Sequence, residues 1–323
     1  MAIKTIGVMT SGGDAPGMNS CIRAVVRTSL YKGLEVVGIQ EGFSGLVFGD
    51  MERLTAREVG GILQRGGTIL GTARCKEFME KSGQREAVRH ANEEGLDGVV
   101  VIGGDGSMRG AKVLDENGIK VVGIPGSIDN DMWGSNMSIG TDTALNTIRN
   151  AIDQLRDTAS SHRRAFIIET MGRNCGYLAV MAGLIGGAEM VLIPEVETTV
   201  EEVAESIEAA YRRGKTHAII VVAEGASVKA TELSNQINSM DVGFSSRVTI
   251  LGHIQRGGRP SAFDRLLATR MGVAAVEWLI DGQSGVMTGL QGRDIMPVPL
   301  DDVTSHDRGA NLEYYQMCRM LAF

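Results

Sequence analysis

Three glycine- and aspartate-rich segments each follow a short apolar run, and this repeated order constrains the fold more than any other feature of the chain. The clearest is Gly103-Gly104-Asp105-Gly106-Ser107, which follows the apolar residues 98–102. The other two are residues 10–19 after 4–9, and residues 125–131 after 120–124. Short apolar runs alternating with amphipathic stretches predict parallel strands joined by helices. Because parallel strands end at one edge of a sheet, we expect the three segments to converge there.

The segment 103–107 is typical of a phosphate site. Glycines let backbone N–H groups approach phosphate oxygens, and a helix predicted to start near Ser107 would turn its N-terminal dipole toward an anion. Polyphosphate would repel Asp105 unless a cation lay between them, so Asp105 indicates a Mg²⁺ ligand. A tight turn with a solvated Asp105 is the alternative for this segment taken alone.

Residues 10–19 form a second glycine-rich segment before a predicted helix. The spacing of Gly12 and Gly17 is like that of a Walker A loop, but Met18 and Asn19 stand where that motif needs Lys and Ser or Thr. The dinucleotide pattern G-x-G-x-x-G is not matched either. The charge that neutralises a phosphate must therefore come from Mg²⁺ and from arginines elsewhere.

Residues 125–131 carry two carboxylates that are two positions apart. Asp129 is a candidate general base for a substrate hydroxyl, and Asp131 is a candidate Mg²⁺ ligand through water. An Asx-rich turn is the alternative for this segment alone.

In five segments the chain resembles the ATP-dependent 6-phosphofructokinases. A Gly-Gly-Asp-Gly match alone is also similar to lipid kinases and NAD kinases, but five matches in the family's order are highly specific. The segments are Thr10-Ser11-Gly12-Gly13-Asp14-Ala15-Pro16-Gly17-Met18-Asn19, Gly103-Gly104-Asp105-Gly106-Ser107, Pro125-Gly126-Ser127-Ile128-Asp129-Asn130-Asp131, Met171-Gly172-Arg173-Asn174-Cys175-Gly176 and Leu251-Gly252-His253-Ile254-Gln255-Arg256-Gly257-Gly258.

The resemblance implies an α/β fold with two Rossmann-like three-layer α/β/α domains and mostly parallel sheets. It assigns residues 1–140 plus 257–305 to a nucleotide-binding domain, and residues 141–256 plus 306–323 to a sugar-phosphate-binding domain. By analogy, the chain would phosphorylate fructose 6-phosphate with Mg-ATP in glycolysis. The alternatives are a catalytically silent regulatory subunit that binds phosphorylated metabolites, and a kinase of a related sugar phosphate.

The resemblance also implies roles for particular residues. Asp129 would be the base, Arg173 would face the transferring phosphoryl group, and Ser127 would hydrogen-bond it. Mg²⁺ would bind Asp105 and Asp131. ATP would contact Gly13, Arg74, Cys75, Gly104, Asp105, Gly106 and Ser107, although Arg74 alone reads as an exposed loop arginine. Fructose 6-phosphate would contact Ser127, Ile128, Asp129, Met171, Gly172, Arg173, Glu224, His253 and Arg256, together with Arg164 and Arg247 of a neighbouring subunit in a homotetramer.

Several positions bear on substrate choice and regulation. Gly106 and Gly126 fit the ATP pattern, because pyrophosphate-dependent relatives have Asp and Lys there. Ser127 replaces the usual Thr, and Ala56-Arg57 replaces the usual Arg-Tyr of the nucleotide effector site. The remaining effector positions match at Arg23, Arg27, Arg156, Glu189, Arg213 and Lys215, for which surface charges without a ligand are the alternative.

Composition is that of a globular cytoplasmic enzyme. The 323 residues are 43% hydrophobic and 22% charged, and the formal net charge of −7 argues against a nucleic-acid surface. The four cysteines show no C-x-x-C spacing, which favours reduced thiols, and no apolar run approaches membrane-spanning length. The expected strands are 4–9, 34–39, 98–102, 121–124, 165–169, 190–193, 218–223 and 249–251, and the clearest expected helices are 143–156, 200–213 and 265–279.

Overall fold

A computed structural model describes residues 3–322, which divide into two compact units. Among the described residues, the first unit comprises 3–128, Met132–Thr143 and Arg256–Asp307. The second comprises Asp129–Asp131, Ala144–Gln255 and 308–322. Both units are interleaved in the sequence, so each sheet and its helices are described separately.

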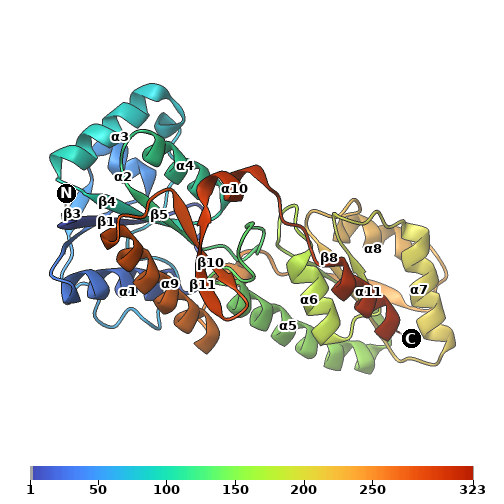
Figure 1. The fold of residues 1–323 in the computed structure, drawn as a ribbon. Coiled ribbons are helices and arrows are strands. Elements are labelled where there is room, and N and C mark those ends of the chain that lie inside the picture. The colour runs from blue at the N-terminus through green and yellow to red at the C-terminus, as the bar shows by residue number, and fades with distance from the viewer. Residues whose placement is uncertain (1–2, 323) are drawn as a thin grey trace. The chain divides into compact units, whose positions relative to one another are not determined.

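The first unit is built on a sheet with the strand order β11-β10-β5-β4-β1-β2-β3 (Figure 1). The pairs formed by β1, β2, β4, β5 and β10 are parallel, whereas β2–β3 and β10–β11 are antiparallel. The strands are β1 (Thr5–Ser11), β2 (Glu35–Ile39), β3 (Met51–Arg53), β4 (Gly98–Gly103), β5 (Val121–Pro125), β10 (Val286–Gln291) and β11 (Asp294–Pro299).

Helices cover both faces of this sheet. One face buries Met9, Val99 and Val101 against α2, α3, α4 and α10, while α1 and α9 pack together on the other face (Figure 1). The helices are α1 (Met18–Tyr31), α2 (Phe43–Phe48), α3 (Lys81–Glu93), α4 (Asp105–Glu116), α9 (Ala262–Ile280) and α10 (Leu300–Ser305), with a 3-10 turn η1 (Glu77–Met79). Because both faces are buried, β4 reads as an unbroken apolar run.

The second unit has a fully parallel sheet with the order β7-β8-β6-β9. Alternate residues of β6 and β8 pack against α7 and α8, and α6 packs on β8 and α11. A capping box between Thr199 and Glu202 starts α7. The elements are β6 (Arg164–Thr170), β7 (Met190–Leu192), β8 (Ala218–Ala223), β9 (Ser245–Ile250), α5 (Thr141–His162), α6 (Tyr177–Gly186), α7 (Val200–Arg212), α8 (Ala230–Asn238), η2 (Gly252–Arg256) and α11 (Leu312–Leu321).

The α/β class with mostly parallel sheets is confirmed, and each of the eight expected strands exists. The expected strand 249–251 was misplaced, because β9 runs from Ser245 to Ile250. The hairpin β10–β11 was not expected. Pro297 and Pro299 lower strand propensity, but both lie on the edge strand β11, where a missing N–H is tolerated.

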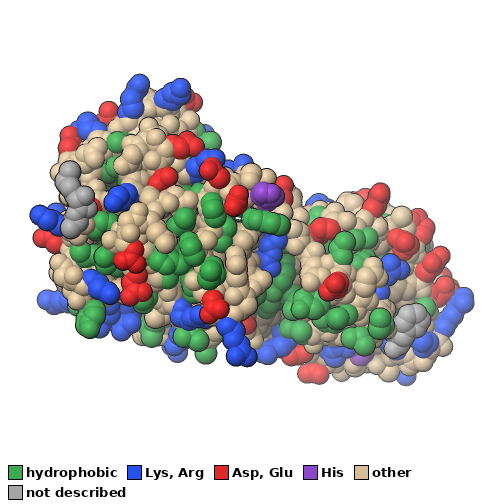
Figure 2. All heavy atoms as spheres, viewed as in Figure 1, with side chains coloured by type: hydrophobic (Ala, Val, Ile, Leu, Met, Phe, Trp, Pro, Cys, Tyr) green, Lys and Arg blue, Asp and Glu red, His purple; other side chains and the backbone are tan. Residues whose placement is uncertain are grey.

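Within residues 3–322, no helix is long and apolar enough to cross a membrane. On the face shown in Figure 2, Lys and Arg side chains are interspersed with Asp and Glu side chains over each unit.

Candidate active site

The three glycine- and aspartate-rich segments converge at one edge of the first sheet. In the parallel register, Ser11 lies opposite Gly103, and Gly103 lies opposite Pro125. The order β5-β4-β1 makes these strands direct neighbours. The segments that follow them therefore begin at the same level, as the sequence pattern predicts.

Close packing explains the glycines at the end of β4. A Cβ on Gly103 would lie 2.4 Å from Ser107 Oγ and 2.5 Å from the Ser11 carbonyl oxygen. A Cβ on Gly104 would lie 3.7 Å from Ser127 Cβ, so the segments 103–107 and 125–131 lie close together at Gly104. Ser107 is buried in the first turn of α4, directly beneath this point. Gly106 is different, because a Cβ there would meet no atom within 4 Å.

Asp105 is the first residue of α4, and its side chain is 41% exposed. The Arg109 Nε donates to both carboxylate oxygens, at 3.2 and 3.1 Å. Among the described residues, no three His, Cys, Asp or Glu side chains form a cluster that could hold a metal ion. A single accessible carboxylate fits Mg²⁺ all the same, because Mg²⁺ is commonly held by one or two carboxylates together with substrate phosphates and water.

Two arginines lie near the glycine-rich segment 10–19: Arg256 lies against it, and Arg74 follows a residue that is hydrogen-bonded to it. Arg256 stands over Gly13, because a Cβ on Gly13 would lie 2.6 Å from the Arg256 Nη1. The exposed Arg74 follows Thr72, whose hydroxyl donates to the Gly12 carbonyl at 2.7 Å. Cys75, beside Arg74, is partly buried, and this burial raises the pKa of its thiol.

In the second unit, β6, β8 and β9 also end at one edge. Thr170 lies opposite Ala223, and Glu169 lies opposite Ile250. Met171 and Gly172 follow β6, Glu224 follows β8, and His253 follows β9 in the turn η2. The Glu224 carboxylate accepts the Arg173 backbone N–H at 2.9 Å. The strand register therefore brings these three predicted sugar-phosphate segments to one edge of the sheet.

Asp129 is nearly buried in the second unit, with 6% of its side chain exposed. Its carboxylate forms an ion pair with the 61% exposed Arg173, with an Nε–Oδ2 distance of 3.6 Å. Arg173 has a backbone φ of 51° and Gly172 has a φ of 136°, so a tight turn aims this arginine. A carboxylate in this setting is a candidate general base, provided that it lies within hydrogen-bond reach of a substrate hydroxyl. Ser127 and Ile128, which precede Asp129, belong to the first unit.

Asp131 has charged neighbours of its own. It lies close enough to Arg308 and to Cys175 to influence both groups, and burial raises the pKa of the Cys175 thiol to about 11. The Arg308 guanidinium lies 5.9 Å from the centre of the Tyr177 ring. Arg308 is therefore a charged group that the Asp131 carboxylate influences, and the role of Asp131 as a metal ligand stays a prediction.

Arg164 and Arg247 lie away from the other predicted sugar-phosphate residues of the second unit. Arg164 is the first residue of β6, and Arg247 lies opposite Phe166. Six residues of strand, about 20 Å, separate Arg164 from Thr170 at the other end of β6. Arg247 is closer, because four residues of strand, about 13 Å, separate its partner Phe166 from Thr170. Neither arginine lies at the strand ends that Met171, Glu224 and His253 follow.

Four of the six predicted effector residues gather in the second unit. The buried Glu189 accepts from Lys215 Nζ at 3.2 Å, and Arg213 and Lys215 donate to the Ala322 carbonyl at 3.4 and 3.2 Å. Arg156 donates to the Gly186 and Gly187 carbonyls and to His217 Nε2. Arg23 and Arg27 lie on α1 of the first unit.

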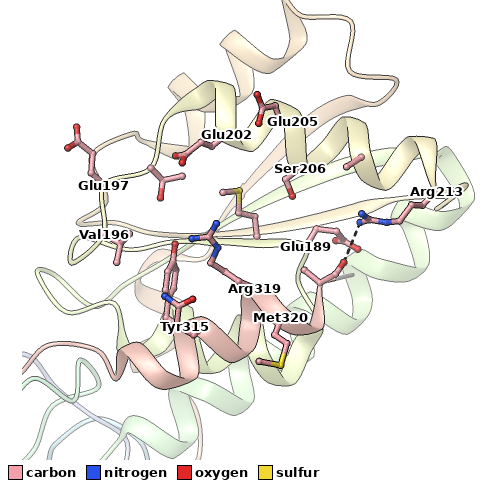
Figure 3. Close-up of a pocket in the computed structure, with 15 residues that line it drawn as sticks. Glu189, Val196, Glu197, Glu202, Glu205, Ser206, Arg213, Tyr315, Arg319 and Met320 are labelled. Atoms are coloured by element: carbon pink, nitrogen blue, oxygen red, sulfur yellow. Dashed lines mark hydrogen bonds between the residues drawn. The ribbon is translucent and has the colours of Figure 1, made fainter.

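Glu189 and Arg213 also line a cavity of about 600 Å³ between α7 and α11. Figure 3 shows Arg319 and Tyr315 projecting from α11 toward α7, with Glu202 and Glu205 on the opposite wall. The side chains around this cavity are mixed in charge. The cavity beside the predicted effector cluster is therefore lined by acidic as well as cationic groups, whereas a phosphate pocket would be mainly cationic.

Sequence reasoning missed the residues that hold these segments in place. Gln255 is fully buried and accepts the Met171 backbone N–H at 3.3 Å. Asp264 is fully buried and binds residues 140 and 143. The pattern Ser261-x-x-Asp264 is a helix-start signature, and Ser261 does cap α9. That signature accounts for the Asp264 backbone N–H and gives no sign of where its carboxylate points.

In the first unit, a glycine-lined sheet edge with the accessible carboxylate of Asp105 and with Arg256 beside Gly13 is typical of a phosphotransferase site. Residues 5–279 match the phosphofructokinase family, and the chain belongs to that family. It is 50% identical to the ATP-dependent 6-phosphofructokinase of Natranaerobius thermophilus and 49% identical to that of Thermotoga neapolitana, with 99% of this chain and all of each relative covered.

Solved structures agree on the fold. Phosphofructokinase from Saccharomyces cerevisiae is 38% identical with a TM-score of 0.87 over 93% of this chain. This chain spans only 45% of that yeast chain. A pyrophosphate-dependent phosphofructokinase from Marinobacter aquaeolei is 20% identical, with a TM-score of 0.86 over 98% of this chain and 91% of its own, and shares the fold.

Proposed function

We propose that this chain transfers the γ-phosphoryl group of Mg-ATP to the 1-hydroxyl of fructose 6-phosphate, giving fructose 1,6-bisphosphate and ADP, the committed step of glycolysis. The observation that carries the proposal is the register that aligns Ser11, Gly103 and Pro125, because it gathers three phosphate-type segments at one sheet edge. Full-length relatives named ATP-dependent 6-phosphofructokinase support the choice of donor and acceptor.

The donor half of the reaction is assigned to the first unit. Backbone N–H groups around Gly13 and Gly104 to Ser107 would hold the phosphates, with Arg74 and Cys75 nearby. Asp105 would hold Mg²⁺, with Asp131 as a second candidate ligand through water. When bound, Mg²⁺ supplies positive charge at the phosphate oxygens. The open space around Gly106 supports ATP over pyrophosphate, since no side chain there restricts the donor.

The acceptor half is assigned to the second unit and to Arg256. Asp129 would take the proton of the 1-hydroxyl as that oxygen bonds to the γ-phosphorus and the bond to the β-phosphate bridging oxygen breaks. Arg173, freed from Asp129 as that carboxylate is protonated, would stabilise charge on the transferring group. Ser127 would donate a hydrogen bond to it. Met171, Gly172 and Glu224 would hold the sugar, and His253 and Arg256 its 6-phosphate.

The proposal includes a homotetramer in the cytoplasm. The distance of about 20 Å along β6 between Arg164 and Thr170 supports the idea that Arg164 serves a site of a neighbouring subunit, and the family pattern gives Arg247 the same role. Four free cysteines are in keeping with a reducing compartment.

A coupled assay of fructose 1,6-bisphosphate formation tests the function directly. We expect turnover with fructose 6-phosphate, ATP and Mg²⁺, and little turnover when pyrophosphate replaces ATP. Absence of product with ATP, from protein that binds ATP and is folded, would favour a silent regulatory subunit. Faster turnover with another sugar phosphate would change the acceptor and leave the donor half intact.

A further inference from the structure

Asp264 is a fully buried carboxylate in the first turn of α9. Its Oδ1 accepts the Gly140 backbone N–H at 2.9 Å. Its Oδ2 accepts the backbone N–H of Thr143 at 2.8 Å and the Thr143 hydroxyl at 2.5 Å. Both N–H groups belong to the start of α5, where backbone donors lack partners within the helix. One side chain of α9 therefore fixes residues 140 and 143.

Residues 139–141 in turn hold Ser127 by its backbone. The Ser127 N–H donates to the Ile139 carbonyl at 3.1 Å, and the Thr141 hydroxyl donates to the Ser127 carbonyl at 3.0 Å. Gly140, the residue between these two partners, is the one that Asp264 binds. Residues 139–143 thus fix the position of Ser127 after β5, and Asp264 holds these residues by hydrogen bonds. We call residues 139–143 the strip.

Residues 139 and 140 of the strip also pack against the glycine-rich segment 10–19. A Cβ on Gly140 would lie 2.7 Å from Ala15 Cβ, and a Cβ on Gly17 would lie 2.7 Å from Ile139 Cγ2. Gly140 and Gly17 have φ values of 104° and 113°, which only glycine adopts readily. A shift of the strip would therefore move residues 15–17 as well as Ser127.

We infer that Asp264 is a positioning residue for phosphoryl transfer, which holds Ser127 and the segment Ala15–Gly17 in register through residues 139–143. The inference rests on the proposed function for its kinetic readout. Asp264 contacts no substrate in this scheme, and acts only through the hydrogen bonds of Gly140 and Thr143. Asp142 of α5 carries a like charge, which adds to the effect of burial on the pKa of Asp264.

The test compares Asp264→Asn with Asp97→Asn. Asp97 is a matched control in the first unit, because its carboxylate also accepts two backbone N–H groups, those of Lys4 and Thr5, but at the opposite end of β1. In Asp264→Asn the side-chain NH₂ must face one of the two backbone N–H groups that donate to the carboxylate in the wild type. Two donors then face each other, and that hydrogen bond is lost. We expect kcat to fall at least tenfold and the half-saturating ATP concentration to rise about threefold or more, because small misplacements of reacting groups are costly.

The half-saturating fructose 6-phosphate concentration should change less than twofold in Asp264→Asn, and Asp97→Asn should leave all three constants unchanged. An unchanged kcat, or an equal loss in both variants, would overturn the inference. If Asp264→Asn fails to fold, Thr143→Val, which removes the hydroxyl that donates to Asp264 and accepts the Ser261 backbone N–H at 2.9 Å, should lower kcat in the same pattern by a smaller factor. No change in Thr143→Val would then count against it.

ATP binding measured by calorimetry separates this inference from the proposed function. A wild-type protein without kinase activity would sink the proposed function. In that case, weaker ATP binding in Asp264→Asn but not in Asp97→Asn would still support the positioning of residues 15–17. Equal ATP binding in all three proteins would overturn it.

Discussion

Replacing Asp264 by asparagine should remove about 1.4 kcal/mol of stability that the wild type gains when the pH falls from 7.5 to 5.0. Burial raises the pKa of Asp264 from 3.8 to about 6 in the folded chain, against the opposing effect of hydrogen bonds from Gly140 and Thr143. The folded state therefore binds a proton more tightly than the unfolded state does. The contribution of this proton to the free energy of unfolding is therefore fully present below the unfolded pKa, and it is lost as the pH rises through the folded pKa.

The magnitude follows from the two pKa values. At pH 5.0, about ten in eleven folded molecules carry the proton on Asp264, but only about one in seventeen unfolded chains do. The resulting difference in binding free energy is about 1.4 kcal/mol, whereas at pH 7.5 it is close to zero. Asparagine does not titrate, so its cost relative to wild type should be about 1.4 kcal/mol greater at pH 5.0 than at pH 7.5.

Urea unfolding followed by tryptophan fluorescence measures this difference. The two tryptophans, Trp133 and Trp278, both lie in the first unit with Asp264, so the signal reports the relevant part of the chain. Comparing variant with wild type at each pH cancels groups that titrate equally in both proteins. A cost of Asp264→Asn that is the same at both pH values would refute the reasoning, and a larger cost at pH 7.5 would reverse its sign.

Four further predictions address the site. Asp129→Ser should lower kcat by several orders of magnitude and change fructose 6-phosphate affinity less than about tenfold, since a base acts mainly in the transition state; near-normal turnover would remove Asp129 from that role. Asp105→Ala should raise the Mg²⁺ concentration needed for half-maximal rate. Arg109→Gln removes the exposed ion pair of Asp105 and should lower that Mg²⁺ concentration by up to about fivefold. Unchanged Mg²⁺ titrations would count against both assignments. Gly106→Asp should suppress ATP turnover through its charge, because an added Cβ at Gly106 would meet no atom within 4 Å, and a matched Gly106→Asn variant should lose much less. Arg164→Ala and Arg247→Ala should each raise half-saturating fructose 6-phosphate by tens-fold, and exchanging subunits of Asp129→Ser with Arg247→Ala should restore activity; hybrids confirmed by mass spectrometry that stay inactive would reject a shared site.

Local patterns predicted the strands in the middle of the first sheet, and the glycine-rich segments that follow them, well. The apolar runs before Gly103 and Pro125 are continuous because both faces of the first sheet are buried, and that burial is visible as composition. Glycines at strand ends marked close approach, and the structure gives the reason at Gly103, where Ser107 and Ser11 leave no room for a Cβ. Edge elements were harder to find. Strand β3 is three residues long, and β11 carries two prolines.

What the sequence by itself determined is the chemistry available at each strand end: an accessible Asp105, the pair Asp129 and Asp131, and the glycines that let phosphate approach a backbone. These features depend on residues within about ten positions of one another, so local patterns contain them. Tertiary structure alone decided which distant groups hold that chemistry in place. Asp264 binds Gly140 from more than a hundred residues away, Arg256 lies over Gly13, and Arg164 lies at the far end of β6 from the residues it was grouped with. The physical reason is that a hydrogen bond or an ion pair depends on the position of the partner in space, and strand order and register, which bring those partners together, are fixed by the packing of the whole unit.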